Sequence, residues 1–308
     1  MLPPPGRPAF PAPGLLPYRV GVTTDKWANW LLRDRDGGSA QLRSQFAADL
    51  TAFRDGVLDR AAIAPGDTVL DVGTGTGLIG LGALDRVGPA GRVVFSDVSA
   101  ALLDECRRQA DPARSSFVQA AADDLSPIPD ASVDVVTTRS VLIYVTRKPA
   151  AFAELYRVLR PGGRLSIFEP INSFADRDGL LGLDPGPADG PIAGLIAKVR
   201  AAYAELAPAT NPMRDFDERD LIRWAREAGF SAVRLDYRAE VGMPGPPVAD
   251  WDAVRRTAPN PLVPTYGDVV ATALTPAERD RFDAYVRSVA GVPTRHTMAT
   301  AYLCATRT

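Results

Sequence analysis

Residues 69–80 read VLDVGTGTGLIG, and this stretch decides the fold. Its first four residues are mostly apolar and indicate a buried strand, three alternating glycines follow, and the next apolar residues suit a helix. A glycine-rich turn between a strand and a helix lets the backbone approach a ligand closely and points N–H groups at it. The stretch therefore predicts the ligand-binding turn of an α/β protein.

Two cofactor classes use such a turn, and the spacing here fits both. Gly75, Gly77 and Gly80 give the G-x-G-x-x-G spacing of dinucleotide binding, whereas Asp71 and the three alternating glycines after it give the acidic-x-G-x-G-x-G spacing of S-adenosylmethionine (SAM) enzymes. A carboxylate beside the turn repels a pyrophosphate but suits the ammonium and sulfonium groups of SAM. Asp71 therefore favours SAM.

An NAD(P)-dependent oxidoreductase is the rival enzyme class. Asp97, at the end of the next expected strand, would bind the ribose hydroxyls of either cofactor. Tyr144 and Lys148 match the Tyr-x-x-x-Lys motif of short-chain dehydrogenases, but that motif needs both side chains on one helical face, and Pro149 disfavours helix at the residue before it. We interpret this match as a coincidence.

Strand and helix patterns alternate along the chain on both sides of the turn. Such alternation predicts a parallel sheet covered by helices on both faces. We expect strands at residues 68–72, 92–97, 115–120, 133–138, 164–170, 232–238 and 296–308. We expect helices at residues 39–60, 77–87, after the cap residue Ser99, at 149–160 and 192–206, in a segment ending at Gly229, and after the capping box at 275–278.

Four segments make up the chain on this interpretation. They are an N-terminal arm and lid helix (1–63), a cofactor-binding core (64–170), a cap insertion (171–213), and the completion of the core (214–308) with a second cap insertion at 241–292. Loops as long as these insertions are usually functional, so we expect the caps to exclude water and select the substrate. The proline-rich N-terminus has neither the pattern of a signal peptide nor that of a membrane span.

The composition limits the classes of molecule that the protein is expected to bind. A chain of 308 residues with 46% hydrophobic residues can bury a large core, and a formal net charge of −2 leaves no positive excess for nucleic acid or an anionic membrane. Two cysteines, Cys106 and Cys304, and a single histidine, His296, form no cluster with metal-ligand spacing. We expect a cytoplasmic, metal-independent protein whose partner is a small molecule or peptide.

Three more stretches, in order along residues 64–170 with the turn, carry a family resemblance: VVFSDVS, AADDLSPIPDASVDVVTTRSVLIYV and AFAELYRVLRPGGRLSIFEP. Together they resemble the class I SAM-dependent methyltransferases, nearest to the ubiquinone/menaquinone-biosynthesis branch and its natural-product relatives. The resemblance implies a Rossmann-like, seven-stranded, mostly parallel sheet with a reversed last strand, helices on both faces and an α-helical cap. It also implies SAM as the cofactor and S-adenosylhomocysteine (SAH) as the product.

The resemblance implies roles for individual residues. The methionine end of SAM would contact Asp71 and the first glycines, the ribose would contact Asp97, and adenine would pack on Val98. After the third strand the family has an acid that this chain lacks, which leaves Asp123 as the contact on the adenine side. The full implied cofactor site is Asp71, Gly73, Thr74, Gly75, Gly77, Asp97, Val98, Ala122, Asp123 and Arg139.

The candidates for acting on the substrate are Arg139, Glu169 and His296. Arg139 follows the fourth strand, in the crevice where open α/β sheets bind ligands, and either binds a substrate carboxylate or pairs with Glu169 or Asp134. Glu169 ends the fifth strand and either serves as a base or accepts backbone hydrogen bonds. A lone histidine such as His296 is more often structural or solvated than a general base.

Methyl transfer is an in-line displacement, so alignment in a dry pocket supplies most of the catalysis. Because the sequence offers no obvious strong base, we predict an oxygen nucleophile of carboxylate or phenol type on a small-molecule or peptidic specialised metabolite. The alternatives are C- or N-methylation of a quinone-like or amine substrate and, outside catalysis, a SAM-binding sensor or scaffold. Two cysteines disfavour arsenic methylation. Tyr18, Trp27 and Trp30 in the arm either close over the site or only pack the arm.

Overall fold

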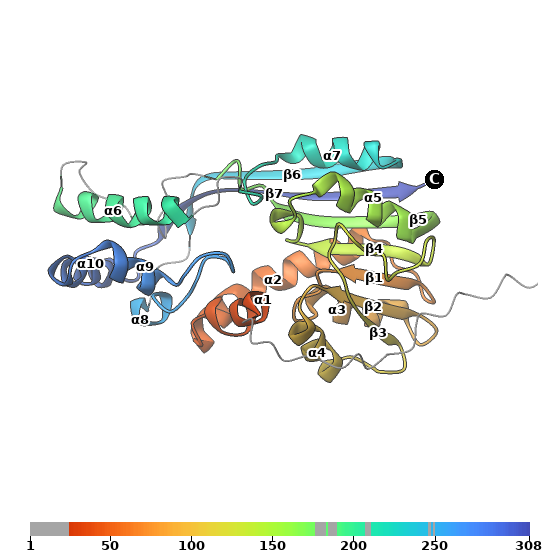
Figure 1. The fold of residues 1–308 in the computed structure, drawn as a ribbon, viewed down its shortest axis with the longest axis horizontal. Coiled ribbons are helices and arrows are strands. Elements are labelled where there is room, and N and C mark those ends of the chain that lie inside the picture. The colour runs from red at the N-terminus through yellow and green to blue at the C-terminus, as the bar shows by residue number, and fades with distance from the viewer. Residues whose placement is uncertain (1–24, 176–182, 184–189, 207–210, 246–247, 249) are drawn as a thin grey trace, which may run out of the picture.

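The computed structural model describes residues 25–175, 183, 190–206, 211–245, 248 and 250–308. Its centre is a seven-stranded sheet in the order β3-β2-β1-β4-β5-β7-β6 (Figure 1). All neighbouring strands pair in parallel except β7, which runs antiparallel to both β5 and β6. The predicted sheet with one reversed strand is confirmed. The strands are β1 (Thr68–Val72), β2 (Arg92–Asp97), β3 (Ser115–Gln119), β4 (Val133–Arg139), β5 (Leu159–Pro170), β6 (Phe230–Gly245) and β7 (Thr294–Arg307).

Two hydrophobic clusters fill the space between the sheet and its helices. One face packs against α2, α3 and α4, and the other packs against α5 and α7. Because both faces are covered, the central strands are apolar throughout rather than alternating, as β1 shows with five buried residues. The helices of this core are α2 (Ala40–Arg60), α3 (Leu78–Val87), α4 (Ala100–Gln109), α5 (Lys148–Val158) and α7 (Glu218–Glu227), with the short 3₁₀ helix η2 (Leu142–Tyr144) before α5.

Two local expectations around α5 are wrong. Lys148 lies at the first helical position although Pro149 follows it, because proline near the start of a helix needs no hydrogen-bond donor there. The helix ends at Val158, and Leu159 already belongs to β5, where it pairs with Val133. Tyr144 nevertheless lies in η2 rather than in α5, so it shares no helix with Lys148. The Lys148 ammonium donates 2.9 Å to the carbonyl of Pro212.

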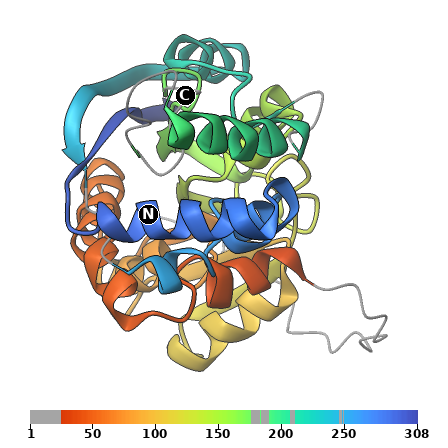
Figure 2. The same ribbon diagram turned by 90° about the vertical axis from the view of Figure 1, so that its left-hand side faces the viewer.

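The two insertions meet in one cap. β6 and β7 are longer than expected and run from the sheet toward α6 and α10 (Figure 1). Viewed from that end, α6 and α10 lie side by side (Figure 2). Apolar side chains of α6, α8, α9 and α10 form a third cluster separate from the sheet, which includes Ile196, Trp251 and Phe282. The cap helices are α6 (Pro191–Leu206), α8 (Trp251–Val254), α9 (Tyr266–Ala273) and α10 (Pro276–Ser288).

The sequence predicts some of the cap helices and not others. α6 and α10 were expected, and the capping box that opens α10 forms as predicted, with Glu278 accepting from the backbone of Thr275 over 2.9 Å. α8 and α9 are not among the expected helices, because their part of the second insertion is rich in proline, which weakens a helical pattern. The described residues contain no helix that is both long and apolar enough to span a bilayer.

Candidate cofactor and acceptor site

The glycine turn lies between β1 and α3 and adopts a backbone that other residues rarely take. Gly73, Gly75 and Gly77 have φ angles of +65°, +57° and +91°. A Cβ atom on Gly73 would lie 2.3 Å from a methyl group of Val141. Gly77 is the N-cap of α3 and forms no side-chain cap. The glycines therefore allow the tight turn that joins the end of β1 to the start of α3.

Asp71 lies beneath the turn and is 1% exposed. One oxygen accepts hydrogen bonds from Thr74 Oγ1 at 2.7 Å and from the N–H of Gly80 at 2.9 Å, and the other accepts from Thr137 Oγ1 at 2.9 Å. Burial raises the pKa of Asp71 to about 6, although these three donors oppose the increase. Both carboxylate oxygens are engaged with the protein, so Asp71 fixes the shape of the turn.

Asp97 lies beside the turn at the end of β2. Its Oδ2 accepts from the N–H of Gly75 and its Oδ1 from the N–H of Ser99, both over 2.9 Å. Burial raises the pKa of this carboxyl group. The carboxylate therefore joins the turn to the start of α4, the position expected for a ribose contact.

The expected adenine side is more open. Val98 is 44% exposed, whereas Ala122 is buried. Asp123 forms an ion pair with Arg147 at 2.9 Å. Val98 presents apolar surface next to Asp97. Asp123 would have to give up its contact with Arg147 to contact the adenine.

A short N-terminal lid covers the turn. It consists of α1 (Lys26–Asn29) and the π-helical turn η1 (Trp30–Asp34). Its cap residue Asp25 accepts 2.5 Å from Ser99 Oγ, next to Asp97. A Cβ atom on Gly75 would lie 3.2 Å from Cδ1 of Leu31. The rings of Trp27 and Tyr144 meet edge to face, with centroids 4.9 Å apart. Tyr18 lies outside the described residues.

Asp25 and Leu31 are site residues that sequence reasoning missed. A local signal was present, because DKWANWLL (residues 25–32) has a helix-capping aspartate before recurring apolar residues. The pattern alone does not say what such a short helix covers.

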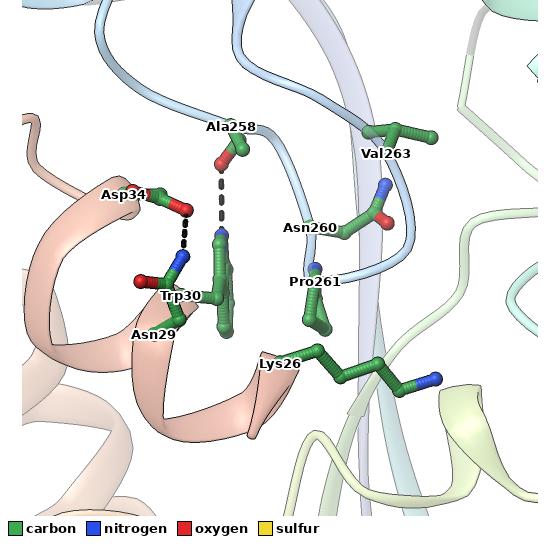
Figure 3. Close-up of a pocket in the computed structure, with 8 residues that line it drawn as sticks. All are labelled: Lys26, Asn29, Trp30, Asp34, Ala258, Asn260, Pro261 and Val263. Carbon is green, nitrogen blue, oxygen red and sulfur yellow. Dashed lines mark hydrogen bonds between the residues drawn. The ribbon is translucent and has the colours of Figure 1, made fainter. Parts of the chain in front are cut away.

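The lid is tied to the cap. Trp30 donates from Nε1 to the carbonyl of Ala258 over 2.8 Å, and the N–H of Ala258 donates to the carbonyl of Asp34 over 2.8 Å. Beside this junction is a cavity of about 190 Å³ (Figure 3). The close-up shows Asn29 directed at Asp34 within it, while Lys26 extends away from them. The same short lid therefore contacts both the cofactor turn, through Leu31, and the cap, through Trp30 and Asp34.

The three candidates for substrate chemistry lie in different surroundings. Glu169 is fully buried and accepts from the N–H groups of Val141, Leu142 and Ile143 at 2.9, 2.9 and 3.3 Å. Burial raises the pKa of Glu169 to about 7. His296 lies on the part of β7 beyond the core and contacts Glu240 on β6 at 3.0 Å.

Arg139 forms neither of its expected ion pairs. Glu169 is occupied by backbone donors, and Asp134 pairs instead with Arg160 at 2.6 Å. The guanidinium of Arg139 lies beside the packed rings of Phe53 and Phe168, 5.4 Å from the first centroid and 5.7 Å from the second, and the two centroids are 4.5 Å apart. Arg139 therefore lines the crevice without a carboxylate partner in the described part of the chain.

The fold and the turn together define a class, an α/β protein that binds a nucleoside-containing cofactor at the carboxyl ends of its strands. The comparisons identify the family within that class. The family model described as a methyltransferase domain matches residues 70–167. The ubiquinone/menaquinone biosynthesis C-methyltransferase UbiE of Pseudomonas putida is 36% identical over 206 residues, covering 64% of this chain and 74% of that protein. The chain belongs to the class I SAM-dependent methyltransferases.

Two further similarities have lower sequence identity. The arsenite methyltransferase of Halobacterium salinarum is 31% identical over 200 residues, covering 63% of this chain and 44% of that protein. The chain spans about half the length of the first curated relatives it matches. Among solved structures, geranyl diphosphate C-methyltransferase from Streptomyces coelicolor A3(2) has a TM-score of 0.48 at 18% identity, covering 89% of this chain and 86% of that one.

The cofactor of this family is SAM, and the residues at the turn fit it. At Gly73, Gly75 and Gly77 the turn has no side chains of its own, and the side chains of Val141, Leu31 and Leu81 come close to it. Asp71 and Asp97 accept backbone hydrogen bonds from Gly80 and Gly75 and so hold its shape. Within the described ranges, no group of three or more His, Cys, Asp or Glu side chains is placed to hold a metal ion together.

Proposed function

We propose that the protein transfers the methyl group of SAM to an oxygen nucleophile, of carboxylate or phenol type, on a small-molecule or peptidic specialised metabolite. When bound, SAM supplies an electrophilic methyl group, which an acceptor oxygen takes while sulfur keeps the electron pair of the broken bond. The backbone of Gly73–Gly77 would hold the methionine end, Asp97 the ribose and Val98 the adenine. Asp71 would act through the turn that it supports.

The proposal of an oxygen nucleophile rests on the contacts that already occupy the acidic side chains and the histidine. Asp71, Asp97 and Glu169 all accept hydrogen bonds from the protein, and His296 contacts Glu240 on the outer part of β7. Each of these three carboxylates is therefore already occupied by donors of the protein itself. Carboxylates and phenols need little help from a base, unlike a carbon nucleophile.

The cap and the lid supply the other requirement, a dry and ordered pocket. We propose that the two insertions act as one acceptor-binding cap, because their helices share a single apolar cluster. The Trp30–Ala258 contact would close this cap over the crevice while Leu31 covers the turn. Holding the acceptor in line with the methyl group then supplies most of the rate.

C-methylation of a quinone-like ring is the second candidate, favoured by the similarity to UbiE proteins. Methylation of arsenic has less support. Cys106 on α4 is buried with its thiol 3.3 Å from the carbonyl of Gly75, whereas Cys304 lies on β7, separated from α4 by several strands. These two thiols cannot bind one arsenic atom together.

The test uses methyl-labelled SAM and a metabolite extract from the source cell. The label should enter a small molecule, and mild base should release it as labelled methanol, because methyl esters hydrolyse under these conditions. A base-stable label that acid cleaves as an aryl ether would identify a phenol. A label that resists both treatments lies on carbon or nitrogen and would contradict the proposal.

A further inference from the structure

β6 is a long strand at the edge of the sheet. It runs from Phe230 to Gly245, and within the described residues it pairs with no strand other than β7. In the end-on view its cyan ribbon lies at the outer margin of the molecule (Figure 2). An antiparallel strand bonds to one neighbour through alternate residues only, so the other N–H and C=O groups of β6 point away from β7. Such an edge can accept a further strand.

Two irregularities delimit a regular stretch of this edge. The pairing of β6 with β7 shifts between Ser231 and Arg234 and again between Glu240 and Met243, whereas the register is unbroken from Arg234 to Glu240. A bulge bends and twists a strand, so a further strand can pair regularly only with the stretch between the bulges. Residues 234–240, which read RLDYRAE, are this stretch, and we call them the β6 edge.

The side chains of the β6 edge divide between the two faces of the sheet. On one face, Leu235 packs against a hydrophobic cluster of the core, and the ring of Tyr237 meets that of Phe174 edge to face, with centroids 6.2 Å apart. The other face carries only charged side chains, because successive residues of a strand point to opposite faces. These side chains are Arg234, Asp236, Arg238 and Glu240.

The charges alternate in sign along the strand. Asp236 pairs with Arg60 of α2 at 2.7 Å, and Arg238 pairs with Glu240 at 2.5 Å. Arg234 is exposed and forms no ion pair in the described part of the chain. Because the signs run plus, minus, plus, minus from Arg234 to Glu240, they are inverted when the strand is read backwards. A second copy of the same strand, running antiparallel, therefore presents the opposite sign at every charged position.

The symmetry of such a pair fixes its register. In a two-fold symmetric contact, if one residue lies opposite a second, the second also lies opposite the first. Opposed side chains of an antiparallel pair point to the same face, so the two-fold axis passes through a residue position. With the axis at Tyr237, Arg234 lies opposite Glu240 of the second copy, and Asp236 lies opposite Arg238. Each opposite-charge pair then occurs twice.

The neighbouring registers are less favourable. An axis at Asp236 or at Arg238 brings like charges together, which destabilises a strand pair. An axis at Leu235 or at Ala239 leaves half of the charges without an opposed partner of opposite sign. Tyr237 is also the midpoint of the regular stretch between the two irregularities, so the register that the charges favour uses the whole β6 edge.

We propose that the protein forms a symmetric dimer in which the β6 edges of two copies pair antiparallel about Tyr237 and join the two sheets into one. The outward backbone groups of each edge would supply the hydrogen bonds, and the alternating charges would set the register. Charged side chains normally protect an edge strand from pairing with other chains. Here the same charges exclude strands of other sequence and admit a second copy, because only the order of signs in RLDYRAE complements itself.

Sedimentation equilibrium of the full chain measures the dissociation constant of the dimer. We expect wild type to dimerise, and Arg234→Glu or Glu240→Arg to weaken the dimer at least about tenfold, because each change opposes like charges at two symmetric places. The double variant, Arg234→Glu with Glu240→Arg, restores opposite signs and should dimerise more tightly than either single variant. Arg281→Glu reverses an exposed arginine on α10, in the cap, and is the matched control that should dimerise as wild type does.

Three results would overturn the inference. Wild type could remain monomeric at every concentration. The two single variants could dimerise as wild type does, which would place the dimer contact on another surface. The double variant could stay as weak as the single variants, which would reject the opposition of Arg234 and Glu240. Recovery in the double variant also excludes a folding defect, because both replacements are still present in it.

Disulfide trapping tests the register independently. Tyr237→Cys places two thiols at the axis, where opposed Cα atoms are about 4.5–5.5 Å apart and a disulfide can form. Oxidation with diamide should convert this variant to a covalent dimer on a non-reducing gel. Ala239→Cys, exposed on the same face, is the control, because its two copies would be offset by about 13 Å along the strands.

Wild type, which retains Cys106 and Cys304, is the blank for disulfide trapping. Neither it nor Ala239→Cys should form the covalent dimer. Trapping of Ala239→Cys in preference to Tyr237→Cys would show a different register and reject the proposed axis.

Discussion

The N–H of Gly75 donates a 2.9 Å hydrogen bond to Oδ2 of Asp97, which joins the glycine turn to the end of β2. The other oxygen of the same carboxylate accepts from Ser99 at the start of α4. One side chain thus positions the turn, the helix and the proposed ribose contact at once.

Asp97→Ala should therefore weaken SAH binding by at least about tenfold, which corresponds to about 1.4 kcal/mol. It removes the proposed ribose acceptor and leaves two backbone donors without their partner. Calorimetric titration with SAH measures the effect. Asp104→Ala, on the exposed side of α4, is the control, and equal affinities of the two variants would contradict the assignment.

Gly75→Val should abolish SAH binding with a limited loss of stability. Valine is strained at a φ of +57°, and its side chain would extend toward Leu31 where the backbone must approach the ligand. Gly162→Val shares the strain, at a φ of +78°, but meets open space at the start of β5. We expect both variants to lose a similar amount of Tm and only the first to lose SAH, as titration would reveal.

Trp30→Phe should loosen the lid while keeping most of its apolar surface. The change removes the hydrogen bond to Ala258, worth about 1 kcal/mol, and should weaken SAH severalfold if lid closure is coupled to binding. Trp251→Phe removes a comparable 2.8 Å bond, to Asp283 inside the cap. The second variant should lose Tm but keep its affinity for SAH, and equal affinities of both variants would show that lid and cofactor are uncoupled.

Glu169 should make stability depend on pH. Its pKa is raised from the ordinary 4.5 to about 7, so in that range the folded protein keeps a proton that the unfolded chain has lost. Stability from this group is therefore complete at low pH, decreases as pH rises from 4.5 to 7, and is constant above. Glu169→Gln cannot ionise and should lack this decrease. Tm curves from pH 5 to 8 that run parallel for the two proteins would refute the prediction.

Methyl transfer should not need a metal ion. A cation, Arg139, stands at the end of β4 in the crevice, and a divalent ion there would be repelled by it. Labelling of the acceptor should be unchanged after treatment with EDTA. Activity that disappears with EDTA and returns with magnesium would show that the crevice binds a metal through the substrate.

Local sequence determined the centre of the fold. The ends of β1 and β2 and the cap at Ser99 agree with their patterns, because apolar runs, turn glycines and capping side chains act within a few residues of one another. The same holds for the capping box at Thr275. The cofactor class also followed from the turn together with the stretches after it.

Tertiary structure decided what each polar group does. The sequence predicts Asp71 beside the turn. The orientation of its carboxylate, however, depends on the hydrogen bond from Thr137, which β4 brings from a distant part of the chain. The lid over Gly75 and the junction of Trp30 with Ala258 likewise join segments that carry no local sign of each other. Arg139 likewise looks like an ordinary arginine in sequence, and only the fold shows that its expected partners Glu169 and Asp134 are already bound elsewhere.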